Sequence, residues 1–323
     1  MVLIRPFNNF DPPRFLQVWN ASLKGPRAVA FPPESTTILE LFTLAKPYFD
    51  REGLLLAFND EQTPVGFIHA GFGVAPDQAS LDKSRGVICS IGVVSSHRRQ
   101  GIGTQLLKRA EEYLRSRGAQ EILAGPIPQA NPFTFGIYGG CDSTGFLASD
   151  GLARPFFEHH GYHLHRSTAI LQVKLRDLKI TPDPRAGNLR QLYEIVGGPF
   201  SKVSWWQEAV LGPIDAVEFR LRRRKSGAVV GRIVLWDMVT YSVNHPAKES
   251  GVGLLLLEIE PESRGHGLGQ FLLTQVLLHL KDQTFDRFEV AVPHENESCL
   301  KLFRSLGFQE VDTGFSFRRL AQA

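Results

Sequence analysis

The chain has 323 residues, of which 43% are hydrophobic and 21% charged, as is ordinary for a soluble globular protein. Its formal net charge of +3 is too small to indicate nucleic-acid binding, and no apolar run approaches the roughly 18 residues that a membrane helix needs. The three cysteines, Cys89, Cys141 and Cys299, lack paired spacing, which excludes a disulfide framework. We therefore expect a cytoplasmic protein with no nucleic-acid or membrane partner.

Apolar residues at three- and four-residue spacing predict helices, and short apolar runs predict strands. In chain order, the first half is expected to have a strand at Val2–Pro6, helices at Pro12–Leu23 and Thr37–Phe49, strands at Leu54–Phe58, Val65–Phe72 and Val87–Val94, a helix at Ile102–Arg117 and a strand at Ala169–Leu175. The second half is expected to have helices at Leu189–Val196 and Ser204–Leu211 and strands at Val217–Arg222, Val229–Met238 and Gly253–Ile259. This alternation predicts an α/β, mixed α+β, fold.

A segment with two prolines close together, residues 179–187, is the best candidate for a linker. Proline interrupts both helix and strand, so neither element is expected to cross it. We therefore expect two domains, at residues 1–178 and 188–323, each of a size that can bury its own core.

Two stretches of the chain, Ile91–Leu107 and Leu257–Leu273, have nearly the same pattern. Each is an apolar strand, an arginine, a glycine-rich turn and an amphipathic helix. Glycines allow a ligand to approach the backbone closely, and the start of a helix offers unpaired N–H groups and a positive dipole end. Arg98 and Arg264 add a guanidinium that can hold a phosphate by two hydrogen bonds. The repeat predicts a tandem pair of domains with a phosphate-binding turn in each.

The turns do not fit the common nucleotide loops. A Walker-type loop needs Lys and Ser or Thr after its last glycine, but Gly103 is followed by Thr-Gln and Gly269 by Gln-Phe. The dinucleotide fingerprint needs a third glycine where Leu106 and Leu272 stand. The pattern instead resembles the pyrophosphate-binding turn of the GNAT superfamily of acyl-CoA-dependent N-acyltransferases. The second copy matches that motif at Leu257, Ile259, Pro261, Arg264, Gly267 and Gly269, and the first at Ile91, Val93, Arg98, Gly101 and Gly103, with Ser95 in place of the proline.

A second stretch supports this resemblance, since GNAT domains continue with a strand, an asparagine and a helix that ends near Leu-Gly-Phe. The second half has these at Val290–Asn296 and Cys299–Phe308. The first half has them at Gly125–Asn131 and Pro155–Tyr162, separated by an insertion at about 132–152 that is rich in glycine and aromatic residues. The insertion is equally compatible with a wall of the acceptor pocket beside the first cofactor site and with a packing loop.

The resemblance implies two tandem GNAT-type domains, each a splayed, mixed, mostly antiparallel sheet flanked by helices, with acyl-CoA in the gap. It implies acetyl-CoA as cofactor, with two molecules per chain, no metal, and transfer of an acetyl or other short acyl group to a primary amine of a small molecule or peptide. A bulge around Ile91–Val93 and Leu257–Ile259 would supply backbone N–H groups to the oxyanion. The implied cofactor-binding residues are Ile91, Gly92, Val93, Arg98, Arg99, Gln100, Gly101, Ile102, Gly103, Thr104 and Asn131 in the first half, and Leu257, Glu258, Ile259, Arg264, Gly265, His266, Gly267, Leu268, Gly269, Gln270 and Asn296 in the second.

The catalytic groups depart from the family pattern. The position of the family's tyrosine acid is Phe157 in one half and Phe303 in the other, and neither can donate a proton. The tandem arrangement is similar to that of mycothiol synthases, but their catalytic glutamate corresponds to Gly253 here. A non-catalytic acyl-CoA-binding protein is therefore the alternative to an N-acyltransferase.

Because an amine must lose its proton before it attacks, we looked for a replacement base. The remaining candidates are Glu258 and Glu260 on the splayed strand, His294 beside the second asparagine, and Tyr138 in the insertion. Each also has a plain structural interpretation, as an exposed strand residue, a surface histidine and a loop residue. We expect the first half to be catalytic, because only that half has additional aromatic residues with which to build an acceptor pocket. The opposite assignment, by analogy with mycothiol synthases, places turnover in the second half.

Overall fold

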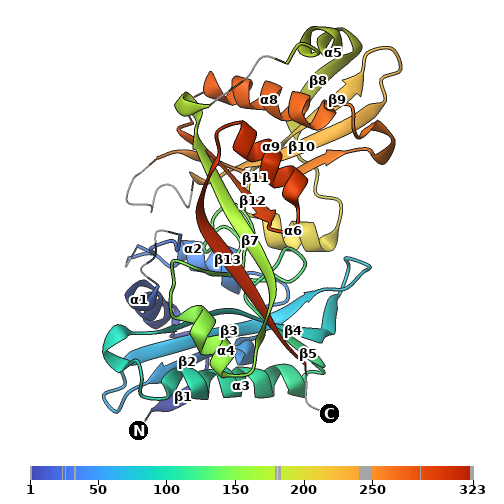
Figure 1. The fold of residues 1–323 in the computed structure, drawn as a ribbon. Helices are drawn as coiled ribbons and strands as arrows, with labels where there is room; N and C mark the ends of the chain where they lie inside the picture. Colours follow the sequence, from blue (N-terminus) through green and yellow to red (C-terminus); the bar gives the residue numbers. More distant parts are fainter. Residues whose placement is uncertain are drawn as a thin grey trace.

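The structure of the chain is a computed structural model, and it describes residues 2–320 apart from 24, 26, 33, 179, 181, 182, 240–248 and 284. Its strands form one continuous 13-stranded mixed sheet with helices packed on it (Figure 1). The elements of the first half are β1 Leu3–Pro6, α1 Pro12–Ser22, α2 Thr37–Leu39, η1 Glu40–Leu44, η2 Arg51–Gly53, β2 Leu54–Phe58, β3 Pro64–Val74, β4 Leu81–Val93, η3 Ser95–His97, α3 Ile102–Ser116, β5 Glu121–Ala124, β6 Phe146–Leu147, α4 Ala153–His159 and β7 His163–Lys174.

The second half repeats the order of the first. Its elements are η4 Leu175–Asp177, α5 Ala186–Leu192, β8 Tyr193–Pro199, α6 Trp205–Leu211, β9 Ala216–Arg223, β10 Val229–Asp237, β11 Gly251–Ile259, η5 Pro261–Ser263, α8 Leu268–Lys281, β12 Arg287–Pro293, α9 Glu297–Ser305 and β13 Gln309–Leu320. The α/β prediction is confirmed.

Three sequence expectations need correction or lie outside the structure. The helix predicted at Leu189–Val196 ends at Leu192, and Tyr193–Pro199 is strand β8, because these residues pair with β9 from Tyr193 opposite Arg223 to Pro199 opposite Val217. The helix predicted at Thr37–Phe49 is shorter, since three α-helical residues lead into the π-helical turn η1. Of the linker expected at 179–187, residues 179, 181 and 182 lie outside the described part of the chain.

The two halves exchange their last strands. The sheet order is β1-β2-β3-β4-β5-β13-β7-β12-β11-β10-β9-β8, so β13 pairs with β5 of the first half while β7 pairs with β12 of the second. Figure 1 shows β7 and β13 crossing the middle of the molecule side by side. Each half therefore depends on the other for the strand that completes its sheet.

We expect neither half to fold alone. Fragments 1–178 and 188–323, expressed separately, would leave β5 and β12 with unpaired edges and should be insoluble or lack cooperative thermal unfolding. Co-expression of the two fragments should restore a soluble complex, because every strand pair is then present. A monomeric 1–178 fragment with a sharp calorimetric transition would contradict this prediction and support two independent domains.

The sheet splays in both halves at the same place. Strand β4 pairs in parallel with β5 only from Arg85 to Ile88, and β11 pairs with β12 only from Gly251 to Gly253. Beyond these residues β4 and β11 keep their antiparallel partners β3 and β10 on one side but have no strand partner on the other, within the described residues. A mixed sheet with a wedge-shaped gap in each half results.

One buried histidine should make the fold sensitive to acid. His69 on β3 has 1% of its surface exposed, stacks on Phe133 with ring centroids 3.9 Å apart, and its Nε2 has no hydrogen-bond partner among the described residues. Burial lowers the pKa of His69 from 6.5 to about 3. The unfolded state therefore binds more protons between these values, so the free energy of unfolding falls as pH is lowered through that range.

From pH 7 to pH 5 the contribution of His69 to this loss should be about 2 kcal/mol. We expect His69→Phe to keep the stacking on Phe133 and to flatten that part of the pH dependence of stability, as measured by urea unfolding at both pH values. His163→Gln, which removes an exposed histidine of β7, is the control. An equal pH slope in His69→Phe and in the unmodified protein would show that His69 titrates normally.

Candidate cofactor and active site

The two glycine-rich turns have nearly identical backbones. Gly101 and Gly267 occupy the N-cap positions of α3 and α8 with φ of +78° and +75°, in the left-handed region that glycine favours. Each turn follows a short 3₁₀ segment at the end of a splayed strand. In this conformation consecutive backbone N–H groups point outward from the N-terminus of the helix, at the positive end of its dipole. Such an arrangement can bind a phosphate.

The arginine in each turn has a structural role in this geometry. The Nε of Arg98 donates to the carbonyl of Val93 at 2.9 Å, and the Nε of Arg264 donates to the carbonyl of Ile259 at 2.9 Å. Arg98 also donates to the carbonyl of Ser22 at 3.2 Å. The two arginines thus tie each turn to the end of its own strand, and the backbone N–H groups are left as the main phosphate donors.

The surroundings of the two turns differ. In the first half, a Cβ on Gly103 would lie 3.2 Å from the ring of Phe156 on α4, and Thr104 is hydrogen-bonded to His160 at 3.0 Å. An aromatic side chain and an imidazole therefore lie over the first turn of α3. The gap between α3 and α4 is closed there.

In the second half, a Cβ on Gly269 would meet only Ile259 of its own strand, at 3.5 Å. Over Gly267 lies the guanidinium of Arg185, with its atoms 2.9–3.0 Å from the position a Cβ would take. Arg185 forms a two-pronged ion pair with Asp183, at 3.0 and 2.9 Å. At the equivalent position of the first half, Gly101, the nearest described neighbour of a Cβ would be the Gln105 amide at 3.9 Å, so the two turns differ in that a cation lies beside the second, where it fits an anionic ligand.

The splayed strands also differ in exposure. Residues 255–259 of β11 are all half-buried, whereas Cys89, Ser90 and Gly92 of β4 are buried. A Cβ on Gly92 would collide with Ser22 of α1, so α1 covers the first splay. Beyond the splay, the residues of β11 are therefore more exposed than those of β4.

Both splayed strands contain a β-bulge. The register shifts leave Cys89 without an opposing residue on β3 and Leu255 without one on β10. The bulges lie two residues earlier than the Ile91–Val93 and Leu257–Ile259 positions expected from sequence. A bulge turns backbone groups out of the ladder, which is how a strand can offer an N–H to a ligand in the gap.

The insertion lies between the two halves and reaches the closed end of the second groove. The N–H of Cys141 donates to Glu289 at 2.7 Å, and the Nε1 of Trp236 donates to the carbonyl of Cys141 at 3.0 Å. Glu289, fully buried, is also paired with Arg27 at 2.8 Å. Since Glu289 faces Gly253 where β11 and β12 separate, the insertion forms a wall at this point. The prediction that the insertion lies beside the first cofactor site therefore omitted its contact with the second half.

Two sequence candidates are buried in the first half. Both ends of the Asn131 amide are engaged within the insertion, since it donates to Ser143 at 2.7 Å and accepts from Thr134. Tyr138 is 5% exposed, its hydroxyl accepts from the N–H of Leu147 at 3.3 Å, and burial raises its pKa. Tyr138 and Arg98 line a cavity of about 330 Å³ at the end of α1. These contacts favour structural roles for Asn131 and Tyr138.

Glu258 and His294 differ in how they are held. Glu258 is ion-paired with Arg232 on the neighbouring strand at 2.9 Å, on the sheet face opposite α8, and both side chains are exposed. His294 lies just beyond β12, half-buried, with Nδ1 at 2.5 Å from the Ser167 hydroxyl and Nε2 at 3.3 Å from a Glu310 carboxylate oxygen. The His294 ring is held by a hydrogen bond at each nitrogen, whereas the Glu258 carboxylate is neutralised by a guanidinium. His294 is therefore the better candidate for an acid–base catalyst.

The partners of His294 were not predicted from the sequence. Ser167 is on β7 and Glu310 on β13, the two exchanged strands. Burial would raise the pKa of Glu310, but hydrogen bonds from Thr313, His294 and Arg304 outweigh it and hold the pKa below its usual value. Asn296 caps α9 by accepting from the N–H of Cys299 at 3.2 Å.

The remaining predicted cofactor residues follow their turns. Ile102 and Leu268 are buried at the starts of the helices. Arg99 has φ +62° where Gly265 has +80°, so the two turns keep the same backbone with different residues. Gln100 bonds to the carbonyl of Ser96 and His266 to that of Ser263. Gln270 lies half-buried in the first turn of α8.

A splayed mixed sheet, a bulged fourth strand and a phosphate-binding turn at the following helix define an acyl-CoA-type transferase fold. The family model of the GNAT acetyltransferases matches residues 17–134 and 198–308, one match in each half, and the chain belongs to this family.

Curated relatives are matched over part of their length. A mycothiol acetyltransferase of Saccharomonospora viridis is 25% identical over 155 residues, which cover 46% of this chain and 44% of that protein. A mycothiol acetyltransferase of Thermobispora bispora is 34% identical over 61 residues, 19% of this chain and 21% of the relative. The matches thus span less than half of the curated relatives.

Solved structures share the tandem fold along the whole chain. A tandem GNAT protein from the clavulanic acid biosynthesis pathway has a TM-score of 0.66 at 16% identity and covers 100% of this chain and 99% of its own. A glucosamine N-acetyltransferase region of a fungal GH3 β-N-acetylglucosaminidase has a TM-score of 0.71 at 18% identity, covering 99% of this chain and 38% of that one. At these identities the likeness concerns the fold alone. Among the described residues, no helix combines the length and apolar character needed to cross a membrane.

Proposed function

We propose that the protein is an acyl-CoA-dependent N-acyltransferase with its cofactor in the second half, between β11 and β12. The observation that carries this proposal is the pairing of an open, bulged splay with the Gly267 turn and the Arg185 guanidinium beside it. Acetyl-CoA, or another short acyl-CoA, is the proposed cofactor, and a primary amine of a small molecule or peptide is the proposed acceptor.

This proposal replaces the expectation of two cofactors per chain and a catalytic first half. Phe156 and His160 cover the turn at Gly103, and Ser22 packs on Gly92 where the first groove would begin. The first half instead contributes the insertion, which closes the far end of the second groove through Cys141. In this proposal the second half binds the cofactor, and the first half supplies a wall of the site.

Bound acyl-CoA supplies a thioester carbonyl that a neutral amine can attack. The bulge at Leu255 would offer a backbone N–H to the carbonyl oxygen as negative charge develops on it. The amine nitrogen forms the new C–N bond, the C–S bond breaks, and the thiolate leaves with the electron pair. One proton must leave the nitrogen, and one must reach the sulfur.

We assign the proton transfer to His294 by way of Ser167: because both ring nitrogens are hydrogen-bonded, the amine gives its proton to the Ser167 oxygen while that hydroxyl passes its own proton to Nδ1. Ser167 and Glu310 fix the orientation of its ring, and the Glu310 carboxylate stabilises the imidazolium that forms when the amine loses its proton. The same imidazolium can return a proton to the leaving thiolate, which replaces the tyrosine that the family uses.

Release of free thiol from acetyl-CoA tests this function. We would measure it with a panel of polyamines, amino acids, aminoglycosides and peptides, with the Gly267→Asp variant as the blank. Acceptor-dependent thiol release by the unmodified protein alone supports the proposal. Acetyl-CoA binding without thiol release for any acceptor would favour the second candidate.

The second candidate is a non-catalytic acyl-CoA-binding protein. It is favoured by one observation: Phe157 and Phe303, at the two tyrosine positions, are fully buried in the cores of their halves. The family's proton donor is thus replaced by core packing in both halves, whereas the turns keep their glycines.

A further inference from the structure

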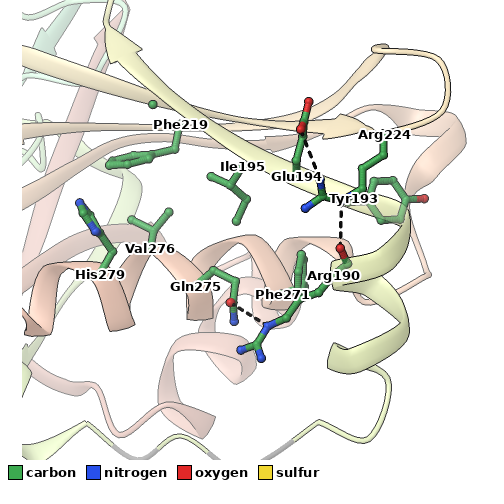
Figure 2. Close-up of a pocket in the computed structure, with 11 residues that line it drawn as sticks. Arg190, Tyr193, Glu194, Ile195, Phe219, Arg224, Phe271, Gln275, Val276 and His279 are labelled. Atoms are coloured by element: carbon green, nitrogen blue, oxygen red, sulfur yellow. Dashed lines mark hydrogen bonds and ion pairs between the residues drawn. The ribbon is translucent and has the colours of Figure 1, made fainter.

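Behind helix α8, on the side away from the β11–β12 groove, lies a cavity of about 540 Å³. Figure 2 shows it between α8 on one side and strands β8 and β9 on the other. The pocket is open to solvent, and a space of this size is within the range of small-molecule sites. None of the residues in the proposed acyl-transfer site lines it.

The corresponding side of the first half is packed differently. There Leu55 and Ala57 of β2 are buried in one core with Leu107 and Ala110 of α3, and Ile4 of β1 is partly buried against it. In the second half, the corresponding strands β8 and β9 place Ile195 and Phe219 opposite α8, and these remain only partly buried. The two copies therefore differ here, since the β2 side chains under α3 are buried whereas Phe219 of β9 under α8 is only partly buried.

The middle of the cavity is apolar. Ile195 and Phe219 come from the sheet, and the buried Phe271 and Val276 come from α8, so the two sets face each other across the space (Figure 2). The ring of Phe219 also meets His279 edge-on at 5.8 Å, which closes one end. A flat apolar body would be sandwiched between sheet and helix side chains.

The other end is cationic. Arg190 of α5 donates from Nε to Gln275 at 3.3 Å, and its terminal nitrogens make no hydrogen bond with any described residue. Arg224 is held in place by the carbonyl of Arg190 at 3.0 Å and by Glu194 at 3.5 Å. Glu194 is also paired with Arg222 at 3.9 Å, so this carboxylate is shared by two guanidinium groups and the charge of Arg190 is left without a carboxylate partner among the described residues. The net positive charge favours an anion.

We propose that this cavity binds a small organic anion with an apolar, planar body, its carboxylate or similar group at Arg190 and its body between Phe219 and Phe271. The charge at one end and the apolar centre specify an amphipathic acid, because a fully polar anion would leave four apolar side chains in contact with water. The site is separate from the acyl-CoA groove and does not depend on the proposed function.

The test uses 2-naphthoate, with 2-naphthalenemethanol as its uncharged analogue, in calorimetric titrations of the full chain without acyl-CoA. We expect one naphthoate per chain and about tenfold weaker binding in Arg190→Gln, the loss of one charge-assisted contact. The alcohol should bind weakly and with equal affinity to both proteins. Gln275→Trp, which fills the cavity from α8, should abolish naphthoate binding.

Arg220→Gln is the matched control, because Arg220 is on the same strand as Phe219 but pairs with Glu218 and is not part of the cavity lining. It should bind naphthoate as the unmodified protein does, as should Gly267→Asp. If Gln275→Trp fails to fold, Ile195→Trp fills the same space from β8. No saturable binding, or binding that survives both Arg190→Gln and the filling variant, would overturn the proposal. Either result leaves the acyl-transfer proposal untouched, since no acyl-CoA is used.

Discussion

Gly267→Asp is expected to abolish acetyl-CoA binding, whereas Gly101→Asp is expected to leave it almost unchanged. A carboxylate at Gly267 would lie among the N–H groups at the start of α8 and against the Arg185 guanidinium. It would then occupy the position of a phosphate oxygen and repel the rest of the pyrophosphate. We expect the affinity to fall at least about a hundredfold, or about 3 kcal/mol, in calorimetric titrations.

The two substitutions form a matched pair. Both glycines have φ near +75° and cap a long helix, so the strain of placing a side chain there is similar. Thermal unfolding should show the shared backbone strain in both variants, and in Gly267→Asp also the effect of the Arg185 guanidinium beside the new carboxylate. Loss of binding in Gly101→Asp alone would place the cofactor in the first half, and two binding events in the unmodified protein would return us to one cofactor per half.

The turns could be predicted from sequence because their requirements are local. A left-handed residue at Gly101 and Gly267 and an arginine that reaches back to its own strand involve fewer than ten consecutive residues, so spacing alone encodes them. The accessibility of each turn could not be predicted. It depends on Phe156 in one half and Arg185 in the other, which approach from helices outside the motif.

The exchange of strands between the two halves could not be predicted from the sequence either. The apolar run at Ala169–Leu175 predicts a strand but not its neighbours, since the hydrogen-bonding groups of the backbone are alike in nearly every residue, and β13 was not predicted at all. Once β13 pairs with β5 and β7 with β12, Ser167 and Glu310 lie beside His294. The environment of the candidate base thus follows from topology.

One signal in the sequence could have located the closed end of the groove. Glu289 interrupts the apolar run of β12, and a charged residue there needs a buried partner. That partner, Arg27, comes from the first half, and the insertion supplies the N–H of Cys141. The aromatic residues of the insertion serve the contact between halves, as in the packing of Phe135 on Trp236 at 5.5 Å.

His294→Ala is expected to lower kcat by about 10²–10⁴ while leaving the affinity for acetyl-CoA unchanged. The side chain is half-buried beyond the end of β12 and makes no contact with the glycine turn in the described structure, so its loss should affect proton transfer rather than cofactor binding. Glu310→Gln keeps the shape of the partner but removes the charge that stabilises the imidazolium. It should lower kcat by about tenfold, in its role as a positioning residue.

Rescue by imidazole and a control variant distinguish a catalytic role of His294 from a structural one. Added imidazole should partly restore turnover in His294→Ala, since a free base can enter the space left by the ring, and a merely structural defect would not respond. His159→Gln, an exposed histidine on α4, is the control and should retain full activity. Unchanged kcat in His294→Ala would exclude it as the base and direct attention to Glu258, whose carboxylate would then have to part from Arg232 before it could accept a proton.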